Sequence, residues 1–552
     1  MTSRLVVIPA RYGSKGIPRK VVRSLGGEPL ISHCLKAVTA PLIGADVVVS
    51  TDDPDVVDLV KAIFPSVTLL ARNPDLCGDS VTLDAVVYDC ASRMIAEGRP
   101  YTSIVTVQPT SPFVRSESIR EAFEVLESGV ADTVLSVKRE QKLKWRIKEG
   151  DPIPLYTERV NRQYIEPEFV ETGAVIGCTS ICLSESRSRI GKRVRLVELS
   201  GREALDIDDP LDWMEAEAAL GQRRIAVITV GSVSNGMGHA YRVATIASDL
   251  AAHNLQFFCA QTEDLAINYL RERNYPVTIY ESRDELMAVL RMFRPDVIIN
   301  DCLDTDRQFV ETQKTIGQKV ICFEDLGGGA RVADALINEL YPPTFDHATA
   351  YSGPAYACLR DEFFWMRPTP REERKGILIT FGGADEGNLT LKCLRWLRGD
   401  QRFDGIRKVV VLGKGYRHWS ELEHWMTLEG LDDIEIIRDT RHMSQLMTTV
   451  RVGICSGGRT VYEYFACETP TVVICQNARE LTHLFLKDVN GVRNFGLYAD
   501  YYRDEFLSAV LALHDNDDEA GHAVASMDSA RIKAGRGRIR HLIVSDTVSL
   551  PR

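Results

Sequence analysis

Several features typical of membrane, secreted and nucleic-acid-binding proteins are missing from this sequence of 552 residues. No stretch reaches the roughly 18 to 20 uninterrupted apolar residues that a membrane-spanning helix needs, and the first residues lack the apolar core and cleavage site of a signal peptide. The formal net charge of −11 provides no basic excess for binding nucleic acid. We therefore expect a cytoplasmic protein with no membrane span and no nucleic-acid partner.

The sequence also lacks a cysteine framework. Its 13 cysteines are scattered, and no CxxC pair or Cys/His cluster has the spacing of a zinc site, so we expect reduced thiols. Low-complexity tracts and short-period repeats are absent as well. With 45% apolar and 26% charged residues, the composition is that of a globular protein.

Short β-branched runs alternate with helical patterns from the beginning of the chain. The strand-like runs are Leu5–Ile8, Asp46–Ser50, Ser103–Val107 and Thr133–Val137, and the helical ones are Pro29–Thr39, Asp53–Phe64 and Thr82–Ile95. This alternation predicts an α/β fold with mainly parallel sheets. A new strand follows Gly221, and a charged, proline-containing connection spans residues 367–375. We expect three domains, over residues 1–221, 222–366 and 375–552.

The first predicted strand ends in a loop rich in glycine and cations, IPARYGSKGIPRK, residues 8–20. Doubly wound sheets bind ligands outside the carboxyl ends of their strands. Glycines let backbone N–H groups approach phosphate oxygens, and Arg11, Lys15 and Lys20 would offset the charge that builds as pyrophosphate departs. The alternative is a solvated basic loop without a ligand, which composition alone favours.

The acidic segment LDIDDPLDW, residues 205–213, is a second candidate. Asp206 and Asp208 are alternate residues of an extended segment, so they point to the same side, and hard oxygen ligands suit Mg²⁺. Asp209 and Asp212 instead fit the start of the helix that follows. The alternative is that all these acids only cap and charge that helix.

These motifs resemble the CMP-sialic acid synthetase family, which activates N-acylneuraminic, pseudaminic and legionaminic acids. Further matches are Ser50–Asp52, the stretch from Arg72 to Ser80, Gln108–Pro112, Arg162–Gln163 and Glu171–Ala174. The resemblance covers residues 4–220 and implies attack by the sugar's anomeric hydroxyl on the α-phosphate of CTP, with Mg²⁺ on the phosphate oxygens and pyrophosphate leaving. The related 3-deoxy-manno-octulosonate cytidylyltransferases have a different opening loop, without SKGIP.

The resemblance also implies residue roles. Lys15, Lys20, Asp206 and Asp208 would be catalytic, with the two aspartates holding Mg²⁺. The residues implied for the nucleotide are Arg11, Gly13, Ser14, Lys15, Lys20, Arg72 and Ser80, and those for the sugar are Gln108, Arg162 and Gln163. Val21 stands where the family usually has asparagine and cannot form a side-chain hydrogen bond, so base selection is open to change. Because the family commonly dimerises through a sheet-edge insertion, we expect a homodimer.

The rear of the chain carries three glycine-bearing strand-to-helix turns. GSVSNGMGHAYR, residues 231–242, places His239 at a helix start, where a histidine tends to be neutral and available as a base. FGGADEGNLT and CSGGRTVYE follow at residues 381–390 and 455–463, and helix starts of this kind receive diphosphates. The alternative is that His239 only hydrogen-bonds within its tight turn, and each motif alone is weak.

In order, these motifs resemble the two-Rossmann (GT-B) sugar-nucleotide enzymes, specifically the UDP-sugar hydrolase of pseudaminic acid biosynthesis and spore-coat polysaccharide proteins. NDCLDT at residues 300–305, FEDLGGG at 323–329 and GPAYACLRDEF at 353–363 belong to the same match. The resemblance implies that His239 activates water for attack at the anomeric carbon of a UDP-linked diacetamido-trideoxyhexose. The residues implied for the nucleotide are Gly382, Gly383, Gly457, Gly458, Thr460 and Glu463.

Alternatives stay open for this rear part. The same fold hosts glycosyltransferases, and a non-catalytic scaffold for the cytidylyltransferase is a third hypothesis. Asp301 and Asp304 are either structural or substrate-facing. The expected partners are CTP, a nonulosonic acid that the sequence does not specify, and a UDP-sugar.

Overall fold

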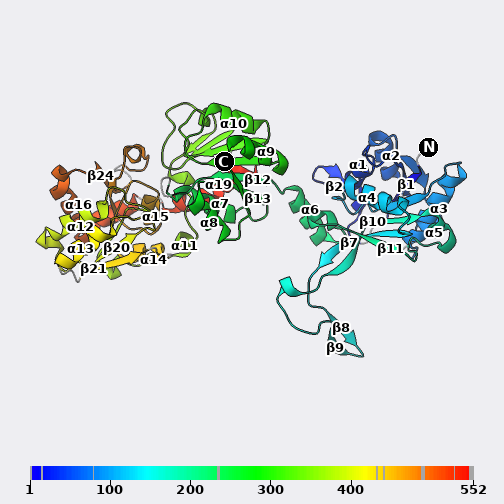
Figure 1. Ribbon diagram of the computed structural model, residues 1–552, viewed down its shortest axis with the longest axis horizontal. Helices are drawn as coiled ribbons and strands as arrows, with labels where there is room; N and C mark the ends of the chain where they lie inside the picture. Colours follow the sequence, from blue (N-terminus) through cyan, green and yellow to red (C-terminus); the bar gives the residue numbers. More distant parts are fainter. Residues whose placement is uncertain are drawn as a thin grey trace. The chain divides into compact units, whose positions relative to one another are not determined.

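The computed structural model describes residues 3–13, 16–78, 80–232, 236–429, 433–438, 440, 442–486, 491–526 and 529–545. The chain divides into two compact units, Met1–Gly221 and Gln222–Arg552, which Figure 1 colours from blue to green and from green to red. Within the described ranges, no helix has both the length and the apolar character needed to cross a membrane.

The first unit is built on one seven-stranded sheet in the order β11-β7-β10-β6-β1-β4-β5. Its strands are β1 (Arg4–Ala10), β4 (Asp46–Thr51), β5 (Thr68–Ala71), β6 (Ser103–Val107), β7 (Thr133–Glu140), β10 (Glu168–Thr179) and β11 (Val194–Glu198). Strand β10 runs antiparallel to its neighbours β6 and β7, and the other pairs are parallel. The chain order reverses direction between β1 and β6, which is where such sheets bind ligands.

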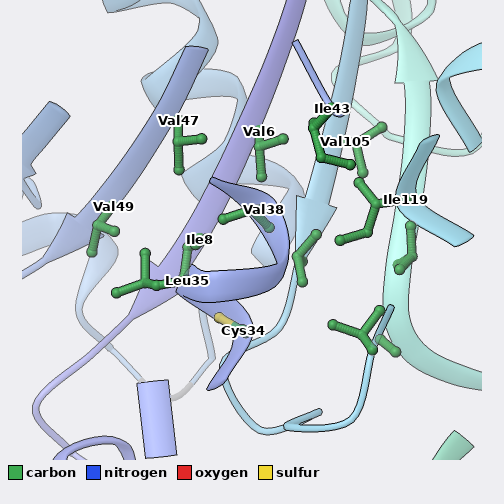
Figure 2. Close-up of a cluster of buried hydrophobic side chains, with 14 of the residues drawn as sticks. Val6, Ile8, Cys34, Leu35, Val38, Ile43, Val47, Val49, Val105 and Ile119 are labelled. Atoms are coloured by element: carbon green, nitrogen blue, oxygen red, sulfur yellow. The ribbon is translucent and has the colours of Figure 1, made fainter. Parts of the chain in front are cut away.

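Helices cover both faces of this sheet. They are α1 (Leu30–Val38), α2 (Pro54–Ile63), α3 (Leu83–Ala96), α4 (Ser116–Glu127), α5 (Ser180–Ser186) and α6 (Pro210–Leu220). Helix α1 buries residues at i, i+4 spacing, and Figure 2 shows Leu35 and Val38 in one cluster with Val6 and Ile8 of β1. Removing this apolar area from water stabilises the unit and holds β1, with the loop after it, in place.

A two-stranded arm, β8 (Trp145–Lys148) and β9 (Asp151–Pro154), leaves the sheet between β7 and β10. Figure 1 shows it hanging away from the rest of the first unit. Every residue of both strands is exposed, including 54% of Trp145 and 68% of Ile147. An isolated hairpin gains too little burial to be stable alone, so this arm lacks a packing partner within its own unit.

The first half of the second unit holds an all-parallel sheet in the order β14-β13-β12-β15-β16-β17-β18. The strands are β12 (Arg224–Thr229), β13 (Asn254–Ala260), β14 (Val277–Tyr280), β15 (Val297–Asp301), β16 (Lys319–Phe323), β17 (Ala335–Asn338) and β18 (Ala350–Ser352). Its helices are α7 (Gly238–Ser248), α8 (Asp264–Arg271), α9 (Arg283–Phe293), α10 (Arg307–Lys314) and α11 (Glu362–Trp365). Chain order reverses between β12 and β15.

The second half repeats this plan with a six-stranded parallel sheet, β21-β20-β19-β22-β23-β24. The strands are β19 (Ile377–Thr380), β20 (Lys408–Leu412), β21 (Ile434–Arg438), β22 (Val452–Cys455), β23 (Thr471–Cys475) and β24 (Val492–Leu497). Its helices are α12 (Leu389–Arg398), α13 (Trp419–Glu429), α14 (Met443–Thr449), α15 (Thr460–Ala466), α16 (Arg503–Asp515), α17 (Asp517–Ala525) and α18 (Ser529–Lys533). The predicted α/β class, with mainly parallel sheets and a pair of Rossmann-like halves in the rear part, is confirmed.

The last helix, α19 (Gly535–Val544), returns to the first half of this unit. Its residues Ile539, Leu542 and Ile543 pack in the core cluster that contains β12 and α7. Buried Lys319 of β16 donates hydrogen bonds to the Leu542 and Ser545 carbonyls at its C-terminal end, at 2.6 and 3.0 Å. The predicted range 375–552 grouped this helix with the second half, whereas its apolar stripe is buried against the first.

Candidate active sites

A cavity of about 320 Å³ lies outside the carboxyl ends of β1 and β6 in the first unit. The residues that line it are Pro9, Arg11, Gly13, Gly16, Lys20, Val21, Arg72, Leu83, Gln108, Pro109, Thr110 and Asp208. Six of the predicted site residues therefore meet in one cavity, although they come from four separate stretches of the sequence: Arg11, Gly13, Lys20, Arg72, Gln108 and Asp208. The basic loop after β1 is thus part of a cavity and not merely a solvated surface.

Lys20 is fixed at the floor of this cavity. Its Nζ donates to the Ile207 carbonyl at 2.5 Å and lies 3.2 Å from a carboxylate oxygen of Asp208, while only 7% of the residue is exposed. The loop comes close to this acidic segment because residue 16 is glycine, and a Cβ there would lie 2.0 Å from the Asp208 carbonyl oxygen. Lys20 is therefore held with a single orientation in the lining of the cavity.

Arg72 enters the cavity from the loop after β5. Its guanidinium is buried and donates to the backbone carbonyl of Ser50 at 2.9 Å and to the Ser50 hydroxyl at 3.4 Å. Burial lowers the pKa of this guanidinium. On the opposite side, the Gln108 amide donates to the carbonyl of Gly173 at 3.1 Å, within the irregular stretch of β10.

The structure separates the aspartates of the acidic segment into two groups. Asp209 and Asp212 form a reciprocal capping box at the start of α6. Asp206 does not cap the helix but accepts a hydrogen bond from Ser111 at 3.3 Å, and burial, with a further contribution from Asp208, raises the pKa of its carboxyl. Within the described ranges, no group of three or more His, Cys, Asp and Glu side chains is placed to hold a metal.

Ser80, Arg162 and Gln163 were also predicted for this site, but they lie elsewhere. Ser14 and Lys15 lie outside the described residues. Ser80 is exposed and is not part of the cavity lining. Arg162 and Gln163 lie on an exposed 3-10 turn after the β8–β9 arm, and neither lines the cavity of its own chain.

In the second unit, His239 lies at the start of α7 with Asp301 beside it at the end of β15. The imidazole Nδ1 is 2.5 Å from Asp301 Oδ1, and Asp301 is fully buried. With Nδ1 taken up by this carboxylate, Nε2 is the nitrogen left to accept a proton from a substrate or water. The sequence left the roles of Asp301 and Asp304 undecided. In the structure Asp301 contacts His239, whereas Asp304 accepts a hydrogen bond from the Leu326 backbone N–H at 2.9 Å.

Buried Arg242, one turn into α7, fixes Asp301. Its guanidinium donates to both carboxylate oxygens of Asp301, at 2.7 and 2.6 Å, and to Glu339 at 3.2 Å. Burial alone would raise the pKa of Asp301, but the charges of Arg242 and His239 outweigh burial and lower that pKa to about 2.

A second buried carboxyl group, Glu324, lies near Arg242. Burial raises the pKa of Glu324, which accepts a hydrogen bond from the Leu340 backbone N–H at 3.0 Å. Sequence reasoning assigned no role to Glu324, which lies within FEDLGGG, and had no signal for Glu339.

The predicted nucleotide loops of the second half follow β19 and β22. Gly382 adopts a positive φ of 76°, the left-handed conformation that glycine tolerates. The Gly457 N–H donates to buried Glu480 at 3.0 Å, which shapes the Gly457–Gly458 loop, and Thr460 begins α15. Glu463 does not stand alone, because Arg360 lies within 3.1 to 3.2 Å of its carboxylate.

Comparison with known proteins assigns the first unit to a class. Residues 5–150 match the family model described as Cytidylyltransferase, so the first unit contains a cytidylyltransferase domain. Over 245 residues the chain is 29% identical to the CMP-N,N'-diacetyllegionaminic acid synthase of Legionella pneumophila, covering 41% of this chain and 99% of that protein. The resemblance of the front part to CMP-sialic acid synthetases is confirmed.

Two further matches each cover more than half of this chain. Uncharacterized protein MJ1062 of Methanocaldococcus jannaschii is 30% identical over 302 residues, which cover 51% of this chain and 62% of that protein. The chain thus spans less than two thirds of the length of this relative. MurG of Acinetobacter baumannii aligns with 58% of this chain and 99% of its own, with a TM-score of 0.43 and 14% identity.

Proposed function

We propose that the first unit transfers CMP from CTP to a nonulosonic acid and releases pyrophosphate. The observation that carries this proposal is the cavity in which Arg11, Lys20 and Arg72 meet Gln108 and Asp208. Three cations beside a glycine-bearing loop suit the negative charge of a triphosphate. The cytidylyltransferase family match supports the nucleotide, and the relative named as a legionaminic acid synthase supports the class of sugar.

In this reaction the anomeric hydroxyl of the sugar attacks the α-phosphorus of CTP, and the bond to pyrophosphate breaks. Lys20, oriented by the Ile207 carbonyl, stabilises the charge that builds on the departing phosphates. Asp206 and Asp208 would hold Mg²⁺, because two carboxylates completed by substrate phosphates are a donor set that this ion prefers. The ion would neutralise charge on the phosphate oxygens.

The test compares Lys20→Met with Lys36→Met in a pyrophosphate-release assay with CTP, Mg²⁺ and each of the three nonulosonic acids. Lys36 is an exposed lysine on α1 that pairs with Glu28, and it serves as the matched control. Lys20→Met is expected to lower kcat/KM by about 100-fold, the scale of losing one preorganised charge from a phosphoryl-transfer site. Equal activity of the two variants would refute the role of this cavity.

We further propose that the second unit hydrolyses a UDP-linked diacetamido-trideoxyhexose to UDP and the free sugar. The contact between His239 and Asp301 carries this proposal, because it orients Nε2 of a histidine as a base. Water would lose its proton to Nε2 as its oxygen bonds to the anomeric carbon, and the bond from that carbon to UDP would break. The Gly457–Gly458 loop at the start of α15 supports binding of the diphosphate. Glu463, whose carboxylate is paired with Arg360, is the residue that would contact ribose.

A glycosyltransferase is the second candidate, because the same halves and the same base would serve a sugar acceptor in place of water. Phosphorus NMR of the protein with UDP-2,4-diacetamido-2,4,6-trideoxyhexose and no acceptor separates the two. Prompt release of UDP that His239→Ala abolishes supports the hydrolase. No release from the folded protein would overturn it in favour of a transferase or a non-catalytic scaffold.

We also propose a homodimer formed through the β8–β9 arm. The arm exposes Trp145 and Ile147, and exposed apolar patches of this kind mark protein interfaces. Arg162 and Gln163 follow the same arm but lie outside the cavity of their own chain, so a sugar contact from them needs a second copy. Light scattering that reports a monomer would exclude this arrangement.

A further inference from the structure

Arg459 belongs to the second half of the second unit but is bound to the first half. It follows the Gly457–Gly458 loop directly, at the start of α15. Its Nε pairs with Glu339 at 2.7 Å, and its two terminal nitrogens donate to the carbonyls of Gly238 and Cys358, at 3.1 and 2.5 Å. Within the described ranges, each hydrogen bond and ion pair of this guanidinium reaches a first-half atom.

These contacts lead to His239 by two routes. Gly238 precedes His239 in the first turn of α7, so the bond to its carbonyl restrains the backbone that carries the imidazole. One carboxylate oxygen of Glu339 contacts both Arg459 and Arg242. Arg242 in turn holds the carboxylate of Asp301, which contacts Nδ1 of His239. Both routes end at the same side chain.

The charge balance of this cluster depends on Arg459. Asp301 and Glu339 are at most 2% exposed, and Glu324 lies 3.6 Å from Arg242 with 3% exposure. Without Arg459, a single guanidinium would face three buried carboxyl groups, and buried carboxylates that lack a cationic partner are costly. Arg242 would then be drawn toward Glu339, at the expense of its hold on Asp301.

Binding of phosphate is the competing role for an arginine beside a glycine loop. Three of the five N–H donors of Arg459 are, however, already engaged by one carboxylate and two carbonyl oxygens, of which Glu339 and Cys358 are buried. A phosphate that leaves these contacts intact would have only the two remaining N–H groups to bind. The geometry therefore favours a link between the halves over a ligand for the substrate.

We propose that Arg459 is a positioning residue for His239, so that the base is correctly placed only while the two halves are joined through this side chain. The proposal deepens the hydrolase role given above to His239 and rests on it. Separation of the halves removes both routes at once, which leaves the imidazole held only by first-half contacts such as that with Asp301. The separated form is then expected to bind nucleotide without activating water.

The test is NMR of the ring nitrogens of His239 in the full chain labelled with ¹⁵N-histidine, with the signal assigned by its loss in His239→Gln. In Arg459→Met the His239 signals are expected to shift or broaden, and kcat for UDP release to fall about 10- to 100-fold, the scale of a misplaced catalytic group. Calorimetry with UDP is expected to give an unchanged Kd. Unchanged His239 signals with a weaker UDP affinity would overturn the proposal and make Arg459 a phosphate ligand.

Arg479→Met is the matched control. Arg479 also crosses from the second half to the first, to the Glu324 carbonyl at 2.7 Å and Asp304 at 3.4 Å. Among the described residues it has no hydrogen bond or ion pair to α7 or to Glu339. Equal changes of the His239 signals in both variants would refute a specific role for Arg459. If Arg459→Met fails to fold, Arg459→Lys gives the same test, because lysine can pair with Glu339 but cannot also span both carbonyls. The NMR readout needs no turnover, so a failed hydrolase proposal stays distinguishable.

Discussion

Gly16 and Asp208 approach so closely that a Cβ on residue 16 would lie 2.0 Å from the Asp208 carbonyl oxygen. This contact joins the basic loop after β1 to the acidic segment before α6, which are almost 200 residues apart in sequence. It brings Lys20 to Asp208 and closes one side of the cavity. The first candidate site therefore depends on a backbone approach that only glycine permits.

Gly16→Ala is therefore expected to separate the two segments. The obstacle is a backbone oxygen, which cannot rotate away as a side chain could, so the loop must shift and carry Lys20 with it. We expect pyrophosphate release to fall by about tenfold or more while the fold is kept. Gly221→Ala is the control, because a Cβ there meets only ordinary contacts at 3.5 Å or more. Unchanged activity of Gly16→Ala would show that the contact is not needed.

Asp301 and Asp304 are expected to respond differently to the same substitution. Asp301→Asn removes the negative charge that holds both Arg242 and His239, and UDP release is expected to fall by about 100-fold or more, in line with a histidine that loses its orienting carboxylate. Asp304→Asn keeps an acceptor for the Leu326 N–H and is expected to leave kcat nearly unchanged. A larger loss in Asp304→Asn than in Asp301→Asn would contradict the assignment of the orienting group.

His483 is expected to make the second unit less stable in acid. It is 3% exposed between Tyr341 and Tyr462, and neither ring nitrogen has a hydrogen-bond partner among the described residues. Burial lowers its pKa to about 3, so the folded protein binds this proton less readily than the unfolded chain does. The contribution of neutral His483 to the free energy of unfolding is fully present above the unfolded pKa of about 6.5 and is lost as the pH falls toward 3. At pH 5 this loss amounts to about 2 kcal/mol.

His483→Phe removes this titration and fills a similar volume among aromatic rings. Urea unfolding of the wild type and the variant at pH 8 and pH 5 measures the effect, because all other titrating groups cancel in the comparison. The variant is expected to lose less stability than the wild type between the two pH values. The same loss in both proteins would show that His483 is not buried as a neutral side chain.

Ile147→Lys is expected to convert a dimer into a monomer. The residue is 68% exposed on the arm, and a charge placed in an apolar interface is disfavoured when water is excluded. Light scattering measures the mass, and Ile95→Lys, at an exposed position on α3, is the control. If the arm carries the interface, loss of sugar activation is expected to accompany loss of the dimer.

Local patterns were sufficient to predict the elements and part of the first site. The i, i+4 apolar spacing of Leu30–Val38 and the alternation of β-branched runs with helices depend on neighbouring residues alone, and α1 and β6 lie where these patterns place them. The division between Asp206 and the capping pair Asp209 and Asp212 was predictable for the same reason, because a capping box has a fixed spacing.

Contacts that depend on how elements pack were not predictable from the sequence. The link from Arg459 to Glu339 joins residues 120 positions apart, in different halves, and its formation depends on the packing of two sheets. The return of α19 to the first half has the same origin, since its apolar stripe fits either half by pattern. Arg162 lies outside the cavity because it follows the β8–β9 arm. The direction in which this arm leaves the sheet cannot be predicted from the neighbouring residues.

The most direct test of the first unit's function is phosphorus NMR of the protein with CTP, Mg²⁺ and, in turn, N-acetylneuraminic, legionaminic and pseudaminic acid. At least one acid is expected to give inorganic pyrophosphate together with a new CMP phosphodiester signal, and both signals are expected to disappear in Lys20→Met. If the folded protein leaves CTP intact with all three acids, it is not a CMP-nonulosonate cytidylyltransferase.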